Sequence, residues 1–198
     1  MSSRILRAAD VAIVPWKNGM GRTRELAVHP ARASAADFLW RASIADVDSA
    51  APFSSFPGID RQIALLDGAG FIMHLDHVQR HALTEPYAFF PFAGEADVDV
   101  ELVDGPTRDF NLMLRRGKVH GRVAVLRGAG KYHVDASAVL VHDVRGSCAT
   151  ADGVLEAGDS WLEPVAGSVL VLDEVGIALM VLVESERDLV RQGDHLLG

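Results

Sequence analysis

The feature that most restricts the fold of this chain is a succession of short segments that either alternate apolar and polar residues or are rich in β-branched and aliphatic residues. Alternation with a period of two is typical of strands that bury one face. Glycine, proline and aspartate interrupt the segments at short intervals, as turns between strands require. Alternation is present at residues 39–45, 98–103 and 110–114. The segments 62–66 and 71–75, and likewise 123–126 and 131–134, flank Gly-Ala-Gly turns, and the segments 139–142, 168–172 and 177–183 are rich in β-branched or aliphatic residues. The sequence therefore predicts an all-β sandwich or barrel with few helices.

Two weak internal matches indicate duplicated β-units. Residues 66–70 (Leu-Asp-Gly-Ala-Gly) resemble residues 126–130 (Leu-Arg-Gly-Ala-Gly), and residues 91–94 resemble residues 164–167 in the same order. We interpret both Gly-Ala-Gly segments as hairpin turns between their flanking strands. Because Gly-Ala-Gly is a common sequence, a chance match is the alternative. No Pro- or Ser-rich linker separates the two halves, so we expect two packed β-lobes that meet near residue 118 rather than two independent domains.

The charge balance argues against one class of partner. The chain has 27 acidic and 19 basic residues and a net charge of −8. A protein that holds nucleic acid by its phosphates needs a basic face, so we expect no nucleic-acid partner. Residues 1–10 lack the apolar run of a signal peptide, and the apolar run at 177–183 is too short to span a bilayer. A single cysteine, Cys148, fits a reducing compartment but also other compartments. We expect a cytoplasmic protein with no membrane partner.

Residues 15–25, Pro-Trp-Lys-Asn-Gly-Met-Gly-Arg-Thr-Arg-Glu, gather polar and charged groups around two glycines and one large aromatic ring. A turn that only reverses the chain needs Gly and Asn but not this whole set. The glycines allow a positive φ or a close approach to another group, and the polar crowding suggests that this group is a ligand. The alternative is a solvated turn in which the tryptophan anchors the core. The candidate binding residues here are Trp16, Lys17, Asn18, Thr23 and Glu25.

Two of the predicted strands carry polar residues on one face. Alternate side chains of a strand share a face, so residues 108–116 and residues 40–45 each separate a polar side from an apolar side. The polar sides hold Asp109, Asn111, Met113 and Arg115 in the first segment, and Arg41 and Ser43 in the second. These groups would suit the wall of a cavity. They supply hydrogen-bond donors and acceptors, positive charge, and the polarisable thioether of a methionine. A solvent-facing surface is the alternative.

A further segment, residues 53–61, adds Phe53, Phe56 and Arg61; for both phenylalanines a core position is the alternative to a ligand contact. The polar segments together hold eight of the 19 basic residues, namely Lys17, Arg22, Arg24, Arg41, Arg61, Arg108, Arg115 and Arg116. Guanidinium groups recognise carboxylates through paired donors, so two of them in one cleft would bind a small anion, most simply a carboxylate. The alternative is that these cations balance neighbouring acids, namely Glu25, Asp46, Asp60 and Asp109, and both can hold at once.

Catalytic and metal-binding patterns are weaker. His74, His77 and His81, followed by Glu85, could ligate a metal ion in principle. An extended hairpin would place His74 and His77 on opposite faces at an exposed turn, so we expect no metal ion and no other cofactor. Cys148 follows His142 by six residues, but the sequence does not place them together. Asp109 and Glu25 could act as an acid–base pair if they share the cavity.

The polar segments resemble the motifs of the HutD/Ves family. The resemblance rests on Pro-Trp-Lys-Asn-Gly at 15–19 with Thr-Arg-Glu at 23–25, on Trp-Arg with Ser-Ile-Ala at 40–45, on Pro-Phe-Ser with Phe-Pro-Gly at 52–58 together with Arg61, and on Asp-Gly-Pro with Asp-Phe-Asn, Met and Arg-Arg at 104–116. Met20 departs from the pattern, where a small residue is expected. The resemblance implies a cupin-like (RmlC-like jelly-roll) bicupin, a single unit over 1–198 with two packed β-barrel lobes at about 1–118 and 119–198.

The family's members are encoded with histidine-utilisation enzymes in many bacteria, and the resemblance implies a protein that binds a pathway intermediate and restrains flux. Urocanate and formylglutamate, both carboxylates, are plausible ligands on that basis. The alternatives are a metal-free cupin enzyme, an isomerase or lyase acting on a small carboxylate through Asp109 or Glu25, and a β-protein interaction module. Exposed strand edges would also permit a homodimer. The predicted ligand-binding residues are Trp16, Lys17, Asn18, Thr23, Glu25, Arg41, Ser43, Phe53, Arg61, Asp109, Asn111, Met113 and Arg115.

Overall fold

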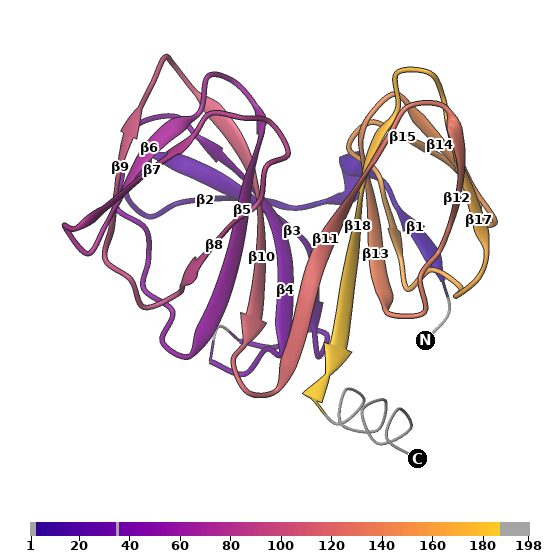
Figure 1. The fold of residues 1–198 in the computed structure, drawn as a ribbon, viewed down its shortest axis with the longest axis horizontal. Coiled ribbons are helices and arrows are strands. Elements are labelled where there is room, and N and C mark those ends of the chain that lie inside the picture. Colours follow the sequence, from indigo (N-terminus) through magenta and orange to yellow (C-terminus); the bar gives the residue numbers. More distant parts are fainter. Residues whose placement is uncertain (1–2, 35, 187–198) are drawn as a thin grey trace. The chain divides into compact units, whose positions relative to one another are not determined.

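Strands make up most of the chain in the computed structural model, which describes residues 3–34 and 36–186 (Figure 1). The all-β prediction is therefore confirmed. The chain divides into a first unit, residues 12–116, and a second unit, residues 1–11 and 117–198. Residues 187–198 of the expected second lobe lie outside the described residues.

The first unit contains two antiparallel sheets. The larger has the strand order β2-β3-β4-β10-β5-β8 and the smaller β7-β6-β9. The strands are β2 (Ile13–Pro15), β3 (Gly21–His29), β4 (Trp40–Val47), β5 (Ile59–Asp67), β6 (Phe71–Leu75), β7 (Gln79–Leu83), β8 (Phe90–Ala93), β9 (Val98–Leu102) and β10 (Thr107–Arg115). The six-stranded sheet brings β10 between β4 and β5, so two segments distant in sequence from β10 become its direct neighbours.

The second unit is also built from two sheets, with the orders β1-β16-β13-β18-β11 and β12-β17-β14-β15. Its elements are β1 (Arg4–Leu6), a 3-10 helix η1 (Ala8–Asp10), β11 (Val119–Arg127), β12 (Gly130–His133), β13 (Ala138–Arg145), β14 (Ser147–Thr150), β15 (Gly153–Glu156), β16 (Ser160–Leu162), β17 (Val169–Leu172) and β18 (Ile177–Ser185). Its core gathers buried side chains from both sheets, including Val141 and Trp161 from one and Cys148 and Leu170 from the other.

The N-terminal segment corrects the expected lobe boundaries. We expected residues 1–118 to form one lobe, but β1 pairs with β16, with Arg4 opposite Leu162 and Leu6 opposite Ser160. Arg7 adds an ion pair to Asp159, with Nη1 2.6 Å from Oδ2. The first unit therefore begins at residue 12, and it ends at Arg116, two residues before the expected boundary.

The two Gly-Ala-Gly turns are not hairpins, which corrects a second expectation. Gly68 and Gly70 connect β5 to β6, and these strands belong to different sheets; the second Gly-Ala-Gly connects β11 to β12, again in different sheets. Glycine is required in the first turn because the backbone at Gly70 passes very close to the backbone at Leu83. Gly70 has a φ of +79°, and a Cβ there would lie 2.0 Å from the carbonyl oxygen of Leu83.

The core of the first unit lies between the inner faces of its two sheets. Ile63 and Leu65 on β5 belong to one buried cluster with Phe71 and Met73 on β6. Arg61 precedes Ile63 by two residues and so shares its face of the sheet. On this inner face the apolar Leu65 and Ile63 of β5 lie beside the polar Asp109 and Asn111 of β10, and Arg61 lies beside Met113 one step further along the same strands.

Candidate functional site

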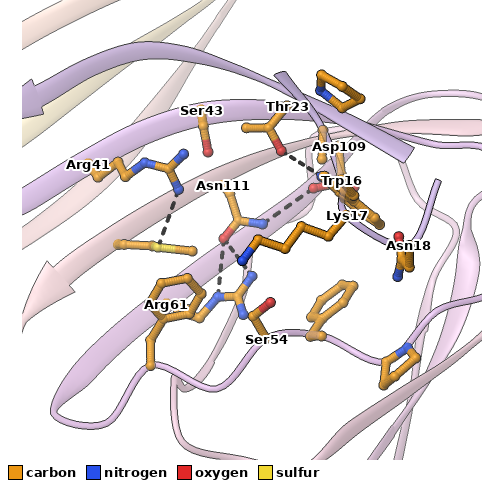
Figure 2. A pocket seen from close by; sticks show the side chains of 16 residues that line it. Trp16, Lys17, Asn18, Thr23, Arg41, Ser43, Ser54, Arg61, Asp109 and Asn111 are labelled. Carbon is orange, nitrogen blue, oxygen red and sulfur yellow. Dashed lines mark hydrogen bonds between the residues drawn. The ribbon is translucent and has the colours of Figure 1, made fainter. Parts of the chain in front are cut away.

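A pocket of about 520 Å³ opens on the inner face of the six-stranded sheet (Figure 2). Three sheet strands, β4, β5 and β10, form its floor, and two loops after β2 and β4 form its walls. It is lined by Pro15, Trp16, Lys17, Asn18, Thr23, Arg41, Ser43, Ala45, Pro52, Phe53, Ser54, Phe56, Arg61, Asp109, Asn111 and Met113. The volume is in the range of pockets that bind small organic molecules.

Strand register explains why the polar residues of the floor meet. On β10, Asn111 lies opposite Ser43 of β4. One step along the same face, Met113 lies opposite Arg41 on β4 and opposite Arg61 on β5. Two arginines therefore flank one methionine across three strands, and the Arg41 Nη1 lies 4.0 Å from the Met113 Sδ. Alternation within each strand fixes the face, and the ladder fixes which residues become neighbours.

Arg61 is the buried cation of the pocket, with 5% of its surface exposed. Its Nε and Nη2 donate hydrogen bonds of 3.3 and 3.1 Å to the Asn111 Oδ1. Its guanidinium carbon lies 4.7 Å from the ring centroid of Phe92, 5.0 Å from Phe53 and 5.7 Å from Phe56. Burial lowers the pKa of Arg61 to about 10, against the opposing charge of Asp109, so the side chain stays cationic at neutral pH.

Asp109 is the buried acid, with 1% of its surface exposed. Its Oδ1 accepts a hydrogen bond of 3.4 Å from the Asn111 Nδ2, whereas its Oδ2 is buried without a hydrogen-bond partner. Burial raises the pKa of Asp109 to about 7; the hydrogen bond from Asn111 and the charge of Arg61 oppose this only in part. The Asn111 amide thus connects the cation to the acid, with its oxygen toward Arg61 and its nitrogen toward Asp109 (Figure 2).

The loop after β2 forms the wall that carries an exposed cation. The Trp16 Nε1 donates a 2.8 Å hydrogen bond to the Thr23 Oγ1, which fixes the indole over the pocket. The Asn18 Oδ1 accepts a 3.0 Å hydrogen bond from the Met20 backbone and so stabilises the turn itself. In Figure 2 the Lys17 side chain points across the pocket in the direction of Arg61. Within the described chain the Lys17 ammonium has no hydrogen bond or ion pair.

The two glycines of this loop have different roles. Gly19 has a φ of +72° and open space where a Cβ would lie. Gly21 is needed for a close approach: a Cβ there would lie 2.5 Å from the backbone oxygen of Asp46 and 3.0 Å from the Trp16 ring. We expected the group that passes close to a glycine to be a ligand, and this is wrong for Gly21, because the neighbouring groups belong to the chain itself.

Two of the predicted binding residues do not line the pocket. Glu25 lies at its outer edge, where its Oε2 accepts a 2.6 Å hydrogen bond from the Arg41 Nε. Arg115 lies near the end of β10 and donates from Nε and Nη2 to the carbonyl oxygens of Phe38 and Ala36, at 2.8 and 2.7 Å. Glu25 therefore contacts the pocket only through Arg41, and the donors of Arg115 bind backbone oxygens outside it. The other eleven predicted residues all lie around the pocket.

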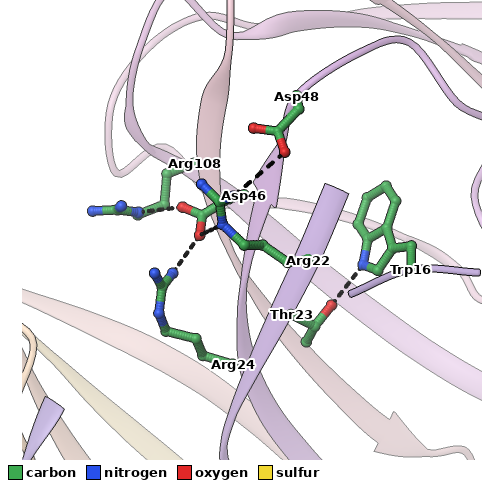
Figure 3. A network of polar contacts seen from close by, with 7 residues as sticks. All are labelled: Trp16, Arg22, Thr23, Arg24, Asp46, Asp48 and Arg108. Carbon is green, nitrogen blue, oxygen red and sulfur yellow. Dashed lines mark hydrogen bonds and ion pairs between the residues drawn. The ribbon is translucent and has the colours of Figure 1, made fainter. Parts of the chain in front are cut away.

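The structure divides the eight cations of the polar segments among several roles. Lys17, Arg41 and Arg61 line the pocket. Arg22, Arg24 and Arg108 surround Asp46, with Arg22 Nε 3.1 Å from Oδ2 and Arg108 Nε 2.7 Å from Oδ1 (Figure 3). Arg116 pairs with Asp60 and Glu95. The cations thus include both pocket-lining groups and partners of neighbouring acids.

The Asp46 cluster, Arg22, Arg24, Asp46 and Arg108, crosses three strands. Arg22 and Arg108 lie directly opposite Asp46 on β3 and β10. Thr23, Ala45 and Asp109, one residue away on each strand, line the pocket, so the cluster lies on the opposite face of the sheet. Burial would raise the pKa of Asp46, but hydrogen bonds from Arg108 and Arg24 outweigh it and hold the pKa below its usual value. The cluster fixes β3, β4 and β10 behind the pocket floor.

Sequence reasoning missed several side chains of the site. Pro15, Ala45, Pro52, Ser54 and Phe56 line the pocket without having been predicted to do so. Alternation from Ser43 would have found Ala45. For Phe56 the sequence leaves a ligand contact and a core position open, and its ring lines the pocket. Phe92, whose ring supports Arg61, carries no local signal, because only the pairing of β5 with β8 places it opposite Arg61.

The candidate metal ligands His74, His77 and His81 lie elsewhere in the first unit. His77 lies in the turn after β6 with a φ of +57°, and both it and His74 border a second hollow of about 420 Å³. The expectation that an extended hairpin separates their faces is therefore wrong, because the turn reorients His77. Within residues 3–34 and 36–186, no three His, Cys, Asp or Glu side chains form a group that could hold a metal ion. Over the same residues, no helix is long and apolar enough to cross a membrane.

Comparison with known proteins identifies relatives along most of the chain. The HutD family model matches residues 8–179. An uncharacterized 21.2 kDa protein in the hutC 3' region of Pseudomonas putida is 36% identical over 138 residues, covering 70% of this chain and 72% of that protein. Protein Ves of Cronobacter sakazakii is 42% identical over 120 residues, covering 59% of this chain and 64% of Ves.

Solved structures extend the comparison to the fold. HutD from Pseudomonas fluorescens SBW25 matches with a TM-score of 0.79 and 30% identity, covering 93% of this chain and 100% of that one. A Cupin 2 conserved barrel domain protein from Leptotrichia buccalis matches with a TM-score of 0.58 at 9% identity, covering 91% of this chain and 96% of that one. At that identity the likeness shows the fold alone, and it confirms the predicted cupin-like architecture.

Proposed function

The chain belongs to the HutD family, and from this premise we propose that its pocket binds a small organic carboxylate and that binding modulates histidine utilisation without catalysis. The Pseudomonas putida relative is described as lying in the hutC 3' region, which supports a link to that pathway. Urocanate and formylglutamate are the proposed ligands, since both are carboxylates of histidine breakdown. The pocket chemistry supports the ligand class, and the family supports the pathway.

The charge of the pocket supports an anionic ligand. Among the described residues that line it are three cations, Lys17, Arg41 and Arg61, and one carboxyl group, Asp109. Because the pKa of Asp109 is about 7, this carboxyl group is only partly ionised at neutral pH. The pocket is therefore cationic in a protein whose net charge is −8. A local cationic lining draws anions selectively when the remaining surface repels them.

The walls of the pocket support an organic rather than an inorganic anion. Trp16, Phe53 and Phe56 contribute aromatic surface, and Met113 contributes a thioether on the floor. A pocket of about 520 Å³ is much larger than a single inorganic anion requires. Apolar walls with a few placed polar groups are typical of sites for small organic molecules. A carboxylate attached to a flat or short carbon skeleton would contact the apolar walls with its skeleton and the polar groups with its carboxylate.

The observation that carries the proposal is the convergence of Lys17, Arg41, Arg61 and Asn111 on one pocket. Titration calorimetry with urocanate, formylglutamate and histidine tests it. We expect saturable binding of at least one carboxylate intermediate, weakened about tenfold by Lys17→Gln or Arg41→Gln, because each removes a charged hydrogen-bond donor.

Two control variants keep the titration specific. Arg115→Gln changes an arginine of the same strand whose donors bind backbone oxygens outside the pocket, and Lys118→Gln changes an exposed lysine of the second unit. Both should leave the affinity within about twofold of the unmodified protein. Absence of binding by all three probes, or equal losses in the controls, would refute the proposal.

A second candidate function, a metal-free cupin enzyme acting on a small carboxylate, is favoured by one observation. Asp109 is a buried acid at the pocket with a pKa of about 7, which suits proton transfer near neutral pH. Glu25 is less suited to share the role, because it pairs with Arg41 at the outer edge. Incubation of the tightest ligand with the protein, followed by chromatography, separates the two functions. Product that is lost in Asp109→Asn would support the enzyme.

A further inference from the structure

The pocket holds one buried cation and one buried carboxyl group, and a ligand carboxylate would compete with the carboxyl group for the charge of the cation. We infer that the pocket takes up a proton on Asp109 when it binds a carboxylate next to Arg61. The inference rests on the proposed carboxylate site and adds a regulation of it, because binding is then tighter at lower pH. The coupling acts through charge and not through contact, since the carboxyl group of Asp109 is buried.

The ionised form of Asp109 has little support besides the charge of Arg61. Its Oδ1 accepts one hydrogen bond of 3.4 Å from the Asn111 Nδ2, and its Oδ2 is buried without a partner. A carboxylate with so few donors is costly to bury unless a cation lies nearby. Burial accordingly raises the pKa of Asp109 to about 7, and the hydrogen bond from Asn111 and the charge of Arg61 hold it from rising further.

Charged groups surround Asp109 on several elements. Arg61 on β5 is the cation that opposes the effect of burial, whereas the charge of Asp46, one residue beyond the direct partner Ala45 on β4, adds to it. Lys17 points across the pocket toward Arg61, and Arg41 lies four residues from Ala45 along β4. On the opposite face of the sheet, three arginines bind Asp46, namely Arg22, Arg24 and Arg108. The ionised Asp109 therefore depends on Arg61 for its counter-charge.

A ligand carboxylate would shift this balance. Arg61 lines the pocket and Lys17 points toward it, so an anion that binds there lies near both cations. A nearby like charge disfavours ionisation of a carboxyl group, and the effect is strongest in a buried site that salt screens poorly. The anion would therefore raise the pKa of Asp109 above about 7, and a proton taken from the buffer would neutralise the carboxylate.

No other described group of the pocket is suited to take up this proton. Among the described residues that line the pocket, Asp109 is the sole carboxyl group and none is a histidine. Glu25 lies at the outer edge, half-exposed and paired with Arg41. Burial would raise the pKa of Asp46, but hydrogen bonds from its arginines hold it below the usual value, so Asp46 stays ionised. The structure therefore assigns the proton to a single residue.

Calorimetry of formylglutamate and urocanate in two amine buffers of different ionisation enthalpy counts the protons taken up on binding. At pH 8 Asp109 is mostly ionised in the free protein, and the ligand carboxylates and the urocanate ring have already lost their protons. We expect an uptake of about 0.4–0.8 proton per bound ligand at pH 8. The affinity should fall about five- to tenfold or more between pH 7 and pH 9, because ionised Asp109 competes with the ligand for Arg61.

A variant then assigns the proton to Asp109. Asp109→Asn resembles the protonated side chain, so we expect proton uptake below about 0.1 and an affinity that stays constant between pH 7 and pH 9. At pH 9 this variant should bind about five- to tenfold more tightly than the unmodified protein, although it has lost a polar group of the pocket. Asp143→Asn is the matched control, because burial also raises the pKa of this acid of the second unit to about 7. It should leave both the proton uptake and the pH dependence of the affinity unchanged.

The outcomes separate this inference from the proposal on which it rests. Saturable binding without proton uptake in the unmodified protein would overturn the coupling and leave the carboxylate site standing. That count needs no variant, so it decides the matter even if Asp109→Asn does not fold. Uptake that persists in a folded Asp109→Asn would also overturn it, because another group would then hold the proton. Absence of binding by both carboxylates would remove the carboxylate site and this inference with it.

Discussion

Arg61 and Asn111 form the polar centre of the pocket, where the guanidinium donates two hydrogen bonds, from Nε at 3.3 Å and from Nη2 at 3.1 Å, to one amide oxygen. Each residue is 5% exposed. A buried guanidinium is tolerated when its donors are satisfied and its charge is supported. The amide accepts from two of the guanidinium N–H groups, and the rings of Phe53, Phe56 and Phe92 support the charge.

Replacement of the amide should therefore destabilise the first unit. We expect Asn111→Leu to lower the free energy of unfolding by about 2–3 kcal/mol, because it leaves a buried guanidinium without its acceptor. Urea denaturation measures the change. Ser43→Ala, at the position opposite Asn111 on β4, is the control and should change stability by less than about 0.5 kcal/mol. Similar losses in both variants would contradict the role given to the amide.

Removal of the Glu25 charge should tighten carboxylate binding. Glu25 accepts a 2.6 Å hydrogen bond from the Arg41 Nε and partly neutralises a cation of the pocket. We expect Glu25→Gln to raise the affinity for a carboxylate about two- to fivefold at low salt, with a smaller effect at high salt because of screening. Titration calorimetry at two ionic strengths measures this. Glu101→Gln, an exposed acid on β9, should have no effect; an equal gain there would point to net charge alone.

A methyl group at Gly21 should displace the Trp16 wall. A Cβ at this position would lie 2.5 Å from the Asp46 backbone oxygen and 3.0 Å from the indole. We expect Gly21→Ala to cost about 1–3 kcal/mol of stability and to weaken ligand binding, because the backbone or the indole must move. Thermal unfolding and calorimetry measure the two effects. Gly130→Ala in the second unit, with its nearest neighbour at 3.4 Å, should be nearly neutral. Unchanged binding in Gly21→Ala would show that the wall adapts.

The buried Asp143 should make stability depend on pH. Neither carboxylate oxygen has a hydrogen bond of good geometry. Burial raises the pKa of Asp143 to about 7, against the nearby Arg145 backbone N–H and assisted by the charges of Asp173, Glu156 and Asp159. Between the ordinary pKa near 3.8 and about 7, the folded state binds more protons than the unfolded state. Its contribution to stability is therefore fully present at low pH and is lost as the pH rises through this window.

Replacement of Asp143 should remove this dependence. We expect Asp143→Asn to raise the free energy of unfolding by about 2–4 kcal/mol at pH 8 and to change it little at pH 4. Thermal unfolding at a series of pH values measures the difference. Glu174→Gln, an exposed acid in the same unit, serves as the control and should leave the pH profile unchanged. A profile of Asp143→Asn that remains parallel to that of the unmodified protein would contradict the assignment.

Several parts of the fold and site could be predicted because they depend on local pattern. Alternation placed Arg41 with Ser43, and Asp109 with Asn111 and Met113, on single faces. Alternation could not predict that the donors of Arg115 bind the carbonyl oxygens of Phe38 and Ala36, because that depends on a loop distant in sequence. The Gly-Ala-Gly turns were recognised as turns, but a turn does not reveal whether the next strand joins the same sheet.

The sequence by itself determined the all-β class, the polar faces of β4 and β10, and the family, because each depends on residue type and short-range order. Only the tertiary structure decided that Phe92 supports Arg61, that β1 joins the second unit, and which three of the eight cations line the pocket. Those outcomes depend on which strands become neighbours. The free energy of such pairings is spread over whole sheets, so no short segment encodes it.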